Sequence, residues 1–163
     1  MMSRILIAGV GNLFRGDDAF GSELARRLAE TPVPPHVCVV DFGIRGHDLA
    51  FALQDEYTAV ILLDVTQRGG RPGELYVLEP DLENLHEDAT DEMMDTHAMH
   101  PLRVLRMVQA NGGKLPRLWL VGCEPVTFGP EEGQMGLSEP VAAAVPAAVA
   151  LVHSLLERMC AHE

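Results

Sequence analysis

Short apolar runs alternate with amphipathic segments along this chain, and the alternation predicts a repeated strand–helix order. Five runs rich in Val, Ile and Leu are predicted as strands: residues 5–8, 37–42, 59–65, 74–78 and 118–122. Four segments carry apolar residues at helical spacing and are predicted as helices: residues 19–29, 48–54, 102–110 and 140–159. Pro146 lies inside the last of these and is expected to kink it.

The strands are apolar at nearly every position, which indicates a sheet buried on both faces. Such strands, alternating with helices, are typical of a mainly parallel sheet with helices packed on each side. The third and fourth strands are joined by residues 66–73 only, too few for a helical crossover, so we expect this pair to be antiparallel with the fourth strand at an edge. The sequence therefore predicts an α/β fold: a single three-layer domain over residues 1–163, with a twisted, mainly parallel five-stranded sheet and helices on both faces.

The composition is that of a globular protein with an acidic balance. Asp and Glu number 24 against 12 Lys and Arg, which gives a formal net charge of −12. This charge disfavours nucleic acid and anionic membranes as partners. Three widely spaced cysteines form neither a disulfide framework nor a zinc ribbon. No stretch approaches the length of a membrane span, and residues 5–10 are too short for a signal-peptide core, so we expect a cytoplasmic protein.

The first strand runs into a glycine turn (residues 9–16) that is followed by two adjacent acids. Gly9 and Gly11 allow a tight bend and leave room for a ligand beside the backbone. Where a dinucleotide-binding turn has its third glycine, this chain has Phe14, and Asp17 and Asp18 follow shortly after. Negative charge at the place of a phosphate indicates a metal ion or a basic group as the ligand.

The carboxyl ends of the predicted strands bring further polar side chains to the same edge of the sheet. Asp18 follows the first strand, Asp64 stands near the end of the third, and His97 precedes the helix predicted at 102–110. Ligands of open parallel sheets bind at this edge, and mixed oxygen and nitrogen ligands suit a divalent ion such as nickel or zinc. Each residue also has a structural interpretation: Asp17 as a helix cap, Asp18 as a helix N-terminal acid, Asp64 as a turn residue and His97 as a cap.

Cys123, at the end of the fifth predicted strand, offers a different chemistry. It would be a thiol nucleophile with His97 as its base. No cysteine-hydrolase signature surrounds it, and a cysteine at a buried strand end is more often a packing residue.

Several blocks of residues follow one another in a specific order. They are Gly9-Val10-Gly11-Asn12, Gly16-Asp17-Asp18, Gly21, Asp41-Phe42-Gly43, Leu63-Asp64-Val65, Thr96-His97, Val121-Gly122-Cys123-Glu124-Pro125 and Gly136-Leu137-Ser138. In these blocks, over nearly its whole length, the chain resembles the maturation endopeptidases of nickel–iron hydrogenases. The resemblance implies a five-stranded α/β sheet. It also implies removal of a short C-terminal extension from a hydrogenase large subunit after nickel insertion, which lets the new C-terminus fold inward and the small subunit join.

The resemblance further implies roles for individual residues. Asp18, Asp64 and His97 are implied to contact the metal and to act in catalysis, with His100 as a near competitor of His97. Asp41-Phe42-Gly43 is implied to line the substrate cleft. The metal is expected to be nickel supplied by the substrate, so the implied partner is a nickel-loaded large-subunit precursor. Whether nickel activates the water, or Asp41 or Asp18 does so, stays open at this point.

Two other functions are consistent with the sequence. A non-proteolytic, nickel-dependent hydrogenase assembly factor would use the same three residues without cutting its partner. A nucleotide-binding α/β module is disfavoured by Phe14 and the acid pair. We expect a monomer, because the sequence shows no exposed apolar seam.

Overall fold

The computed structural model describes residues 4–55, 57–80 and 101–161. The strands in chain order are β1 (Ile5–Val10), β2 (Val37–Gly43), β3 (Ala59–Val65), β4 (Leu75–Leu78) and β5 (Arg117–Cys123). The helices are α1 (Phe20–Ala29), α2 (Gly46–Leu53), α3 (Pro101–Ala110) and α4 (Glu139–Ala161), and a short 3-10 helix, η1 (Gly16–Ala19), precedes α1. All the predicted strands and helices are therefore present.

The sheet has the strand order β2-β1-β3-β5-β4. Its pairs β1–β2, β1–β3 and β3–β5 are parallel, and β4–β5 is antiparallel, which confirms the mainly parallel sheet with one antiparallel edge strand. The expected pairing of the third with the fourth strand is wrong, because β5 lies between them. The connection between β3 and β4 crosses the end of β5: the Thr66 N–H donates to the Cys123 carbonyl at 2.9 Å, and the Glu124 N–H donates to the Glu74 carbonyl at 2.8 Å.

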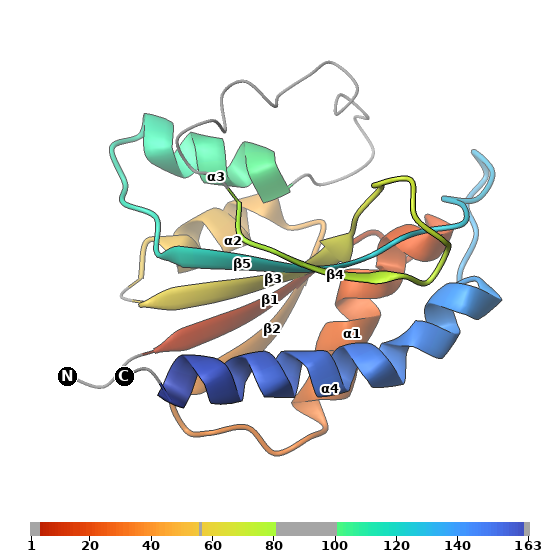
Figure 1. Ribbon diagram of the computed structural model, residues 1–163. Coiled ribbons are helices and arrows are strands. Elements are labelled where there is room, and N and C mark those ends of the chain that lie inside the picture. The colour runs from red at the N-terminus through yellow and green to blue at the C-terminus, as the bar shows by residue number, and fades with distance from the viewer. Residues whose placement is uncertain (1–3, 56, 81–100, 162–163) are drawn as a thin grey trace.

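The helices form a layer on each face of the sheet (Figure 1). One core lies between the sheet and the helices α1 and α4, and a second lies on the face that α2 and α3 cover. Successive residues of β1 alternate between them: Ile5 and Ile7 belong to the first core, and Leu6 and Ala8 to the second. This explains why the strand is apolar at every position, since both of its faces are buried.

Glycines let α1 lie unusually close to the strands. A Cβ atom on Gly21 would collide with the Leu63 and Val10 carbonyls, and one on Gly9 would collide with the Gly21 carbonyl and the Ala25 side chain. The room beside the glycine turn is therefore taken by the backbone of α1 rather than left for a ligand. The close fit fixes where the acids that follow the turn are placed.

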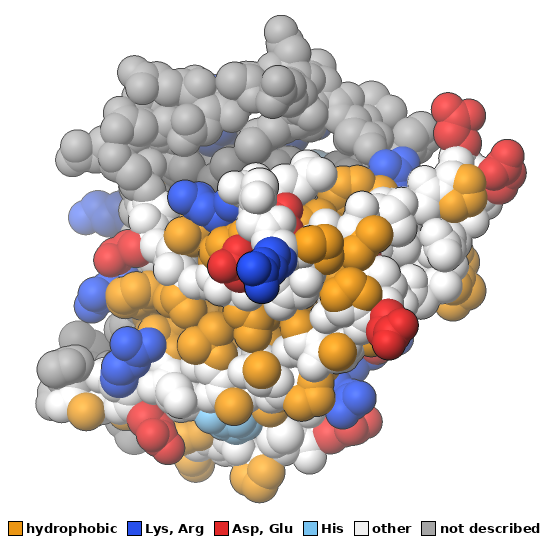
Figure 2. All heavy atoms as spheres, turned by 45° about the vertical axis from the view of Figure 1, so that its right-hand side comes forward, with side chains coloured by type: hydrophobic (Ala, Val, Ile, Leu, Met, Phe, Trp, Pro, Cys, Tyr) orange, Lys and Arg blue, Asp and Glu red, His pale blue; other side chains and the backbone are white. Residues whose placement is uncertain are grey.

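Helix α4 runs from Glu139 to Ala161 and continues through Pro146. By length and composition it could cross a membrane, with a mean hydropathy of 1.6, which corrects the expectation that no stretch approaches that length. Of the 18-residue window of α4 that meets this test, 33% is buried, and Val141, Val145 and Val152 pack into the core shared with α1. In Figure 2, hydrophobic side chains gather on the face where β4 and α4 lie.

Candidate functional site

Four strands end at one edge of the sheet, and the segments that follow them carry acids. The parallel strands β1, β2, β3 and β5 all finish there, so Asp18, Asp41, Asp64 and Glu124 come to the same edge. This is the edge at which open parallel sheets bind their ligands. The four acids differ in the hydrogen bonds and ion pairs that the rest of the protein makes to their carboxylate oxygens.

Asp64 is half-buried at the penultimate position of β3. Its Oδ1 accepts a hydrogen bond from the adjacent Val65 N–H at 2.8 Å. Burial raises the pKa of Asp64 well above its usual range, and the negative charge of Asp18 raises it further, while the hydrogen bond from Val65 opposes the change. The negative charge of Asp18 therefore acts on Asp64 at this edge of the sheet.

Asp18 is half-buried in η1 and follows the glycine turn. The Asn12 N–H donates to its Oδ2 at 2.9 Å, so the turn folds back onto the acid. A Cβ atom on Gly11 would collide with the Asp18 carbonyl, and Gly11 has a φ of 154°. The glycine turn therefore holds Asp18 in place through close backbone contact.

Two of the three residues predicted to contact a metal, Asp18 and Asp64, therefore lie at the same edge of the sheet. His97, the third, and its competitor His100 lie outside the described residues, so their part in the site stays a prediction. Within residues 4–55, 57–80 and 101–161, no group of three His, Cys, Asp or Glu side chains is placed to hold a metal ion. Asp18 and Asp64 form a like-charged pair, and such a pair favours either a shared proton or a cation supplied from outside.

Asp17, the neighbour of Asp18, is fully buried. Its Oδ2 accepts hydrogen bonds from the Val126 N–H at 2.8 Å, the Thr127 N–H at 3.2 Å and the Ser138 hydroxyl at 2.8 Å. Its Oδ1 accepts one from the Ser138 N–H at 2.7 Å. No capping hydrogen bond is made by a side chain at the start of η1, so the interpretation of Asp17 as a helix cap is wrong. Asp17 instead joins the glycine turn to the loop between β5 and α4.

Glu124 is a second buried acid with many donors. Its Oε1 accepts from the Arg68 N–H at 2.9 Å, the Gly70 N–H at 3.0 Å and the Tyr76 hydroxyl at 2.8 Å. Burial raises the pKa of Glu124, but these hydrogen bonds lower it by more, so the net change is downward. Glu124 therefore fixes the connection between β3 and β4 through its Oε1.

Asp41, near the end of β2, is engaged on both oxygens. Its Oδ1 accepts from the Gly43 N–H at 3.0 Å, and its Oδ2 forms an ion pair with the Arg26 Nε at 3.3 Å. These contacts bend the chain at Gly43, which has a φ of 57°. Because the protein engages both oxygens of Asp41, the structure argues against Asp41 as the residue that activates water.

Cys123 is fully buried at the end of β5. Burial raises the pKa of its thiol to about 12, and the nearby charges of Asp17 and Glu124 act in the same direction. A nucleophilic cysteine needs a lowered pKa and access to substrate. The structure therefore argues against Cys123 as a nucleophile.

Comparison with known proteins agrees with the fold. The sequence profile of the hydrogenase maturation protease family matches residues 20–155. The chain belongs to the hydrogenase maturation protease family. Members of this family are hydrolases, and the five-stranded mixed sheet is the fold of its solved structures.

Three relatives illustrate the family match. The hydrogenase 2 maturation peptidase of a Thaumarchaeota archaeon is 34% identical, with a TM-score of 0.70 over 95% of this chain and 99% of that one. The hydrogenase maturating endopeptidase HybD of Escherichia coli is 25% identical, with a TM-score of 0.79 over 96% and 93%. The delta subunit of the coenzyme F420 hydrogenase of Methanothermobacter thermautotrophicus is 27% identical over 92% of each chain.

The role of one residue that shapes this edge, Asp17, was not predicted from the sequence. Asp17 was assigned a local capping role, whereas its partner Ser138 lies 121 residues further along the chain. Both residues stand in blocks that carry the family resemblance, Gly16-Asp17-Asp18 and Gly136-Leu137-Ser138. That shared occurrence was the available signal that they act together.

Proposed function

We propose that this protein is an endopeptidase that removes the C-terminal extension of a nickel–iron hydrogenase large subunit after nickel has been inserted. In this proposal Asp18 and Asp64, together with His97, recognise the nickel ion in the precursor. Nickel belongs to the substrate, and the partner is the nickel-loaded large-subunit precursor. The protein is expected to act in the cytoplasm as a monomer.

The observation that carries the proposal is the pair of half-buried carboxylates at the edge of the sheet. Burial and the charge of Asp18 both disfavour ionisation of Asp64. An approaching divalent cation reverses this, because it stabilises both negative charges at once. The edge is therefore built to respond to a cation that arrives with the substrate.

The ligand types support nickel as that cation. Carboxylate oxygens with one imidazole suit a borderline divalent ion, and two carboxylates leave coordination positions for ligands that come from the precursor. A bound metal can polarise a scissile carbonyl or lower the pKa of a water molecule. In the proposal, recognition of the ion also positions the peptide bond next to the acids.

Asp64 is the carboxylate best suited to take a proton from the attacking water. Without the cation its pKa is raised, and the arriving cation restores the ionised form that a base requires. Asp41 is a poorer candidate because Arg26 and the Gly43 N–H occupy its oxygens. This assignment makes the proposed enzyme an aspartyl-type endopeptidase whose substrate carries the metal.

The proposal is tested by mixing the protein with nickel-loaded and nickel-free forms of a large-subunit precursor and measuring the product masses. Loss of a C-terminal peptide from the loaded form alone is the expected result. A complex that forms without any loss of mass supports the assembly-factor alternative instead. Equal cleavage of both forms contradicts the role of nickel.

A further inference from the structure

Large hydrophobic side chains are exposed at the edge of the sheet that carries the acids. Phe14 is 62% exposed, Val126 is 51% exposed and Met135 is 70% exposed. Phe14 belongs to the glycine turn after β1, and the other two belong to the loop between β5 and α4. We call these three side chains the apolar rim. Exposed apolar residues gathered at one place mark an interaction site more often than scattered ones do.

The two segments of the apolar rim are joined by backbone hydrogen bonds. The Gln134 N–H donates to the Phe14 carbonyl, and the Gly16 N–H donates to the Gln134 carbonyl, both at 2.8 Å. Arg15 and Gln134 form an isolated parallel β-bridge at this point. Met135 is therefore held beside the turn that carries Phe14.

The buried carboxylate of Asp17 also holds the loop between β5 and α4 beside the glycine turn. It accepts hydrogen bonds from the Val126 and Thr127 N–H groups and from Ser138, which lie at the two ends of the loop. The exposure of Val126 and Met135 is thus a property of an anchored loop. When a partner covers apolar side chains that are already held in place, the free energy falls, because apolar surface leaves water and little conformational entropy is lost.

The apolar rim is also close to the proposed cleavage site. Phe14 is four residues before Asp18, and Asn12 connects the two: its side-chain Oδ1 accepts from the Phe14 N–H and its own N–H donates to Asp18, both at 2.9 Å. A chain that lies with its scissile bond at Asp18 and Asp64 must pass near this turn. The occupant is thereby limited to the part of the precursor that flanks the bond.

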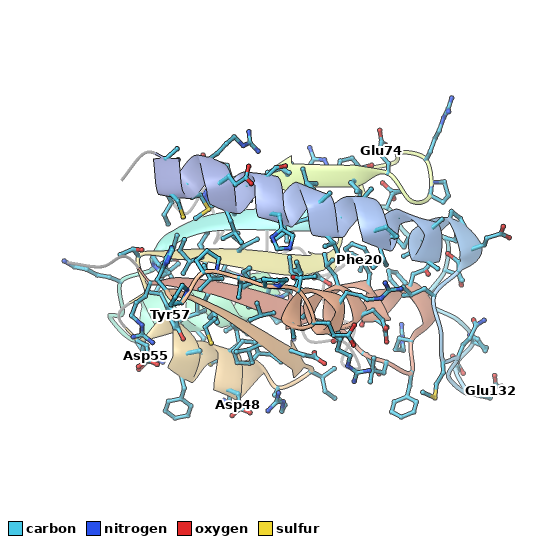
Figure 3. All side chains as sticks on the ribbon, turned by 90° about the horizontal axis from the view of Figure 1, so that it is seen from below. Phe20, Asp48, Asp55, Tyr57, Glu74 and Glu132 are labelled. Atoms are coloured by element: carbon cyan, nitrogen blue, oxygen red, sulfur yellow. The ribbon has the colours of Figure 1, made fainter. Side chains whose placement is uncertain are left out.

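The charges near the apolar rim indicate which charge the precursor segment should carry. Glu131 and Glu132 are exposed on the loop that carries Met135. In Figure 3, Glu132 projects from this loop at the end of the molecule opposite Asp55 and Tyr57. The whole chain has a formal charge of −12, so the surroundings favour a basic segment over an acidic one.

From these observations we infer that the apolar rim of Phe14, Val126 and Met135 is a docking surface for an extended segment of the precursor next to the cleaved bond. That segment carries apolar side chains that cover the rim and a basic residue that faces Glu131 and Glu132. This inference rests on the proposed function, because it names the part of the substrate that the same edge recognises.

The experiment compares Phe14→Ser and Met135→Ser with the control Phe51→Ser in cleavage of the nickel-loaded precursor. Phe51 is 73% exposed on α2, so it matches Phe14 in residue type and exposure but is not part of the rim. We expect each rim variant to raise KM about tenfold with kcat within about twofold, because it removes binding and leaves the acids in place. The Phe51→Ser variant is expected to match the wild-type enzyme.

A charge variant tests the second part of the inference. Glu132→Lys should raise KM about threefold at low salt, with a smaller effect at high salt, because the contact is at an exposed position. Rim variants with wild-type KM would overturn the docking surface. Dissociation of a wild-type dimer by Phe14→Ser, seen by light scattering, would overturn it in favour of a second copy as the occupant.

These outcomes are separate from failure of the proposed function. If the wild-type enzyme leaves the nickel-loaded precursor intact, the endopeptidase proposal fails before any variant is compared. If the wild-type enzyme cuts and the rim variants cut with unchanged KM, only the docking surface fails.

Discussion

The acids at the functional edge of the sheet form two contrasting pairs. Asp17 and Glu124 are buried, and between them they accept hydrogen bonds from the 124–138 and 66–76 segments. Asp18 and Asp64 are half-buried, and each accepts a backbone hydrogen bond while facing the charge of the other. The first pair is stabilised by the protein, and the second is left with an unfavourable charge interaction that a cation relieves.

The contrast between Asp17 and Asp18 shows that position in the sequence does not decide the role of an acid. These two residues are neighbours, yet one anchors a distant loop and the other faces the site. What separates them is what each carboxylate meets: Asp17 accepts hydrogen bonds from the loop between β5 and α4, whereas the negative charge of Asp18 acts on Asp64. A carboxylate saturated with donors has a structural task, whereas one placed near a like charge is a candidate for ligand binding.

Asp64→Asn is expected to have the largest effect on activity. It removes one charge of the pair that faces the metal, and we expect the rate of precursor cleavage to fall about 100-fold or more. The fold should be kept, because the amide can still accept from the Val65 N–H. Cleavage assays followed by mass spectrometry, with circular dichroism as the check on folding, measure this. Wild-type cleavage by the folded variant would contradict the role of Asp64.

Asp17→Ala is expected to have the largest effect on stability. It leaves the Val126, Thr127 and Ser138 donors without their acceptor, which should lower the free energy of unfolding by about 3 kcal/mol. Asp18→Ala, the matched control, should cost about 1 kcal/mol because loss of the hydrogen bond from the Asn12 N–H is partly offset by relief of the repulsion with Asp64. Urea unfolding of both variants compares them, and equal losses would remove the distinction between the two acids.

Much of the fold could be predicted from the sequence because its strands are apolar on both faces. β3 was predicted with its observed bounds because its buried run Ala59–Leu63 is bounded by polar residues. The pairing of β4 could not be predicted, since it depends on a strand that comes about forty residues later in the chain. Length of a connection limits which strands can be neighbours, but it does not tell whether another strand is inserted between them.

The pH dependence of stability should differ in sign between the two pairs. The pKa of Glu124 is lowered by folding, so Glu124 stabilises the fold above its ordinary pKa of about 4.3, and this is lost as the pH falls through the lowered value. The pKa of Asp64 is raised, so its penalty is absent below about pH 4, grows as the pH rises and is complete above the raised value.

Variants of these two acids reveal that difference in urea unfolding from pH 3 to 8. Relative to the wild-type protein, Glu124→Gln should lose stability as the pH rises toward about 4.3 and keep that deficit at higher pH, because the wild-type carboxylate then contributes fully. Asp64→Asn should gain roughly 1 kcal/mol by pH 7, because the conflict with Asp18 is removed. If the free energy of unfolding changed with pH in the same direction in both variants, the proposed difference between Glu124 and Asp64 would be contradicted.

Cys123→Ala is expected to have the smallest effect on activity. The thiol has a pKa of about 12 and is fully buried, so it is neither ionised nor accessible at neutral pH. Cleavage should stay within about twofold of wild type. Labelling of the native protein with a thiol reagent should modify the exposed Cys38 well before Cys123. A large loss of cleavage in a stable variant would support Cys123 as a nucleophile and contradict this prediction.

The site was predictable as far as the topology brings strand ends together. Asp18 and Asp64 were expected to meet because both lie at the ends of parallel strands, and the charge of Asp18 does act on Asp64. The task of Asp17 was not predictable from its surroundings in the sequence, because its hydrogen-bond donors lie more than 100 residues away. His97 stays a prediction from the family resemblance.

The most direct test of the account is whether Asp64 makes precursor binding depend on nickel. Isothermal titration calorimetry would measure the affinity of the wild-type and Asp64→Asn proteins for the nickel-loaded and nickel-free precursor. We predict that the wild-type protein binds the loaded form at least about tenfold more tightly, and that Asp64→Asn binds both forms with nearly equal affinity. An unchanged preference for the loaded form in Asp64→Asn would contradict the account.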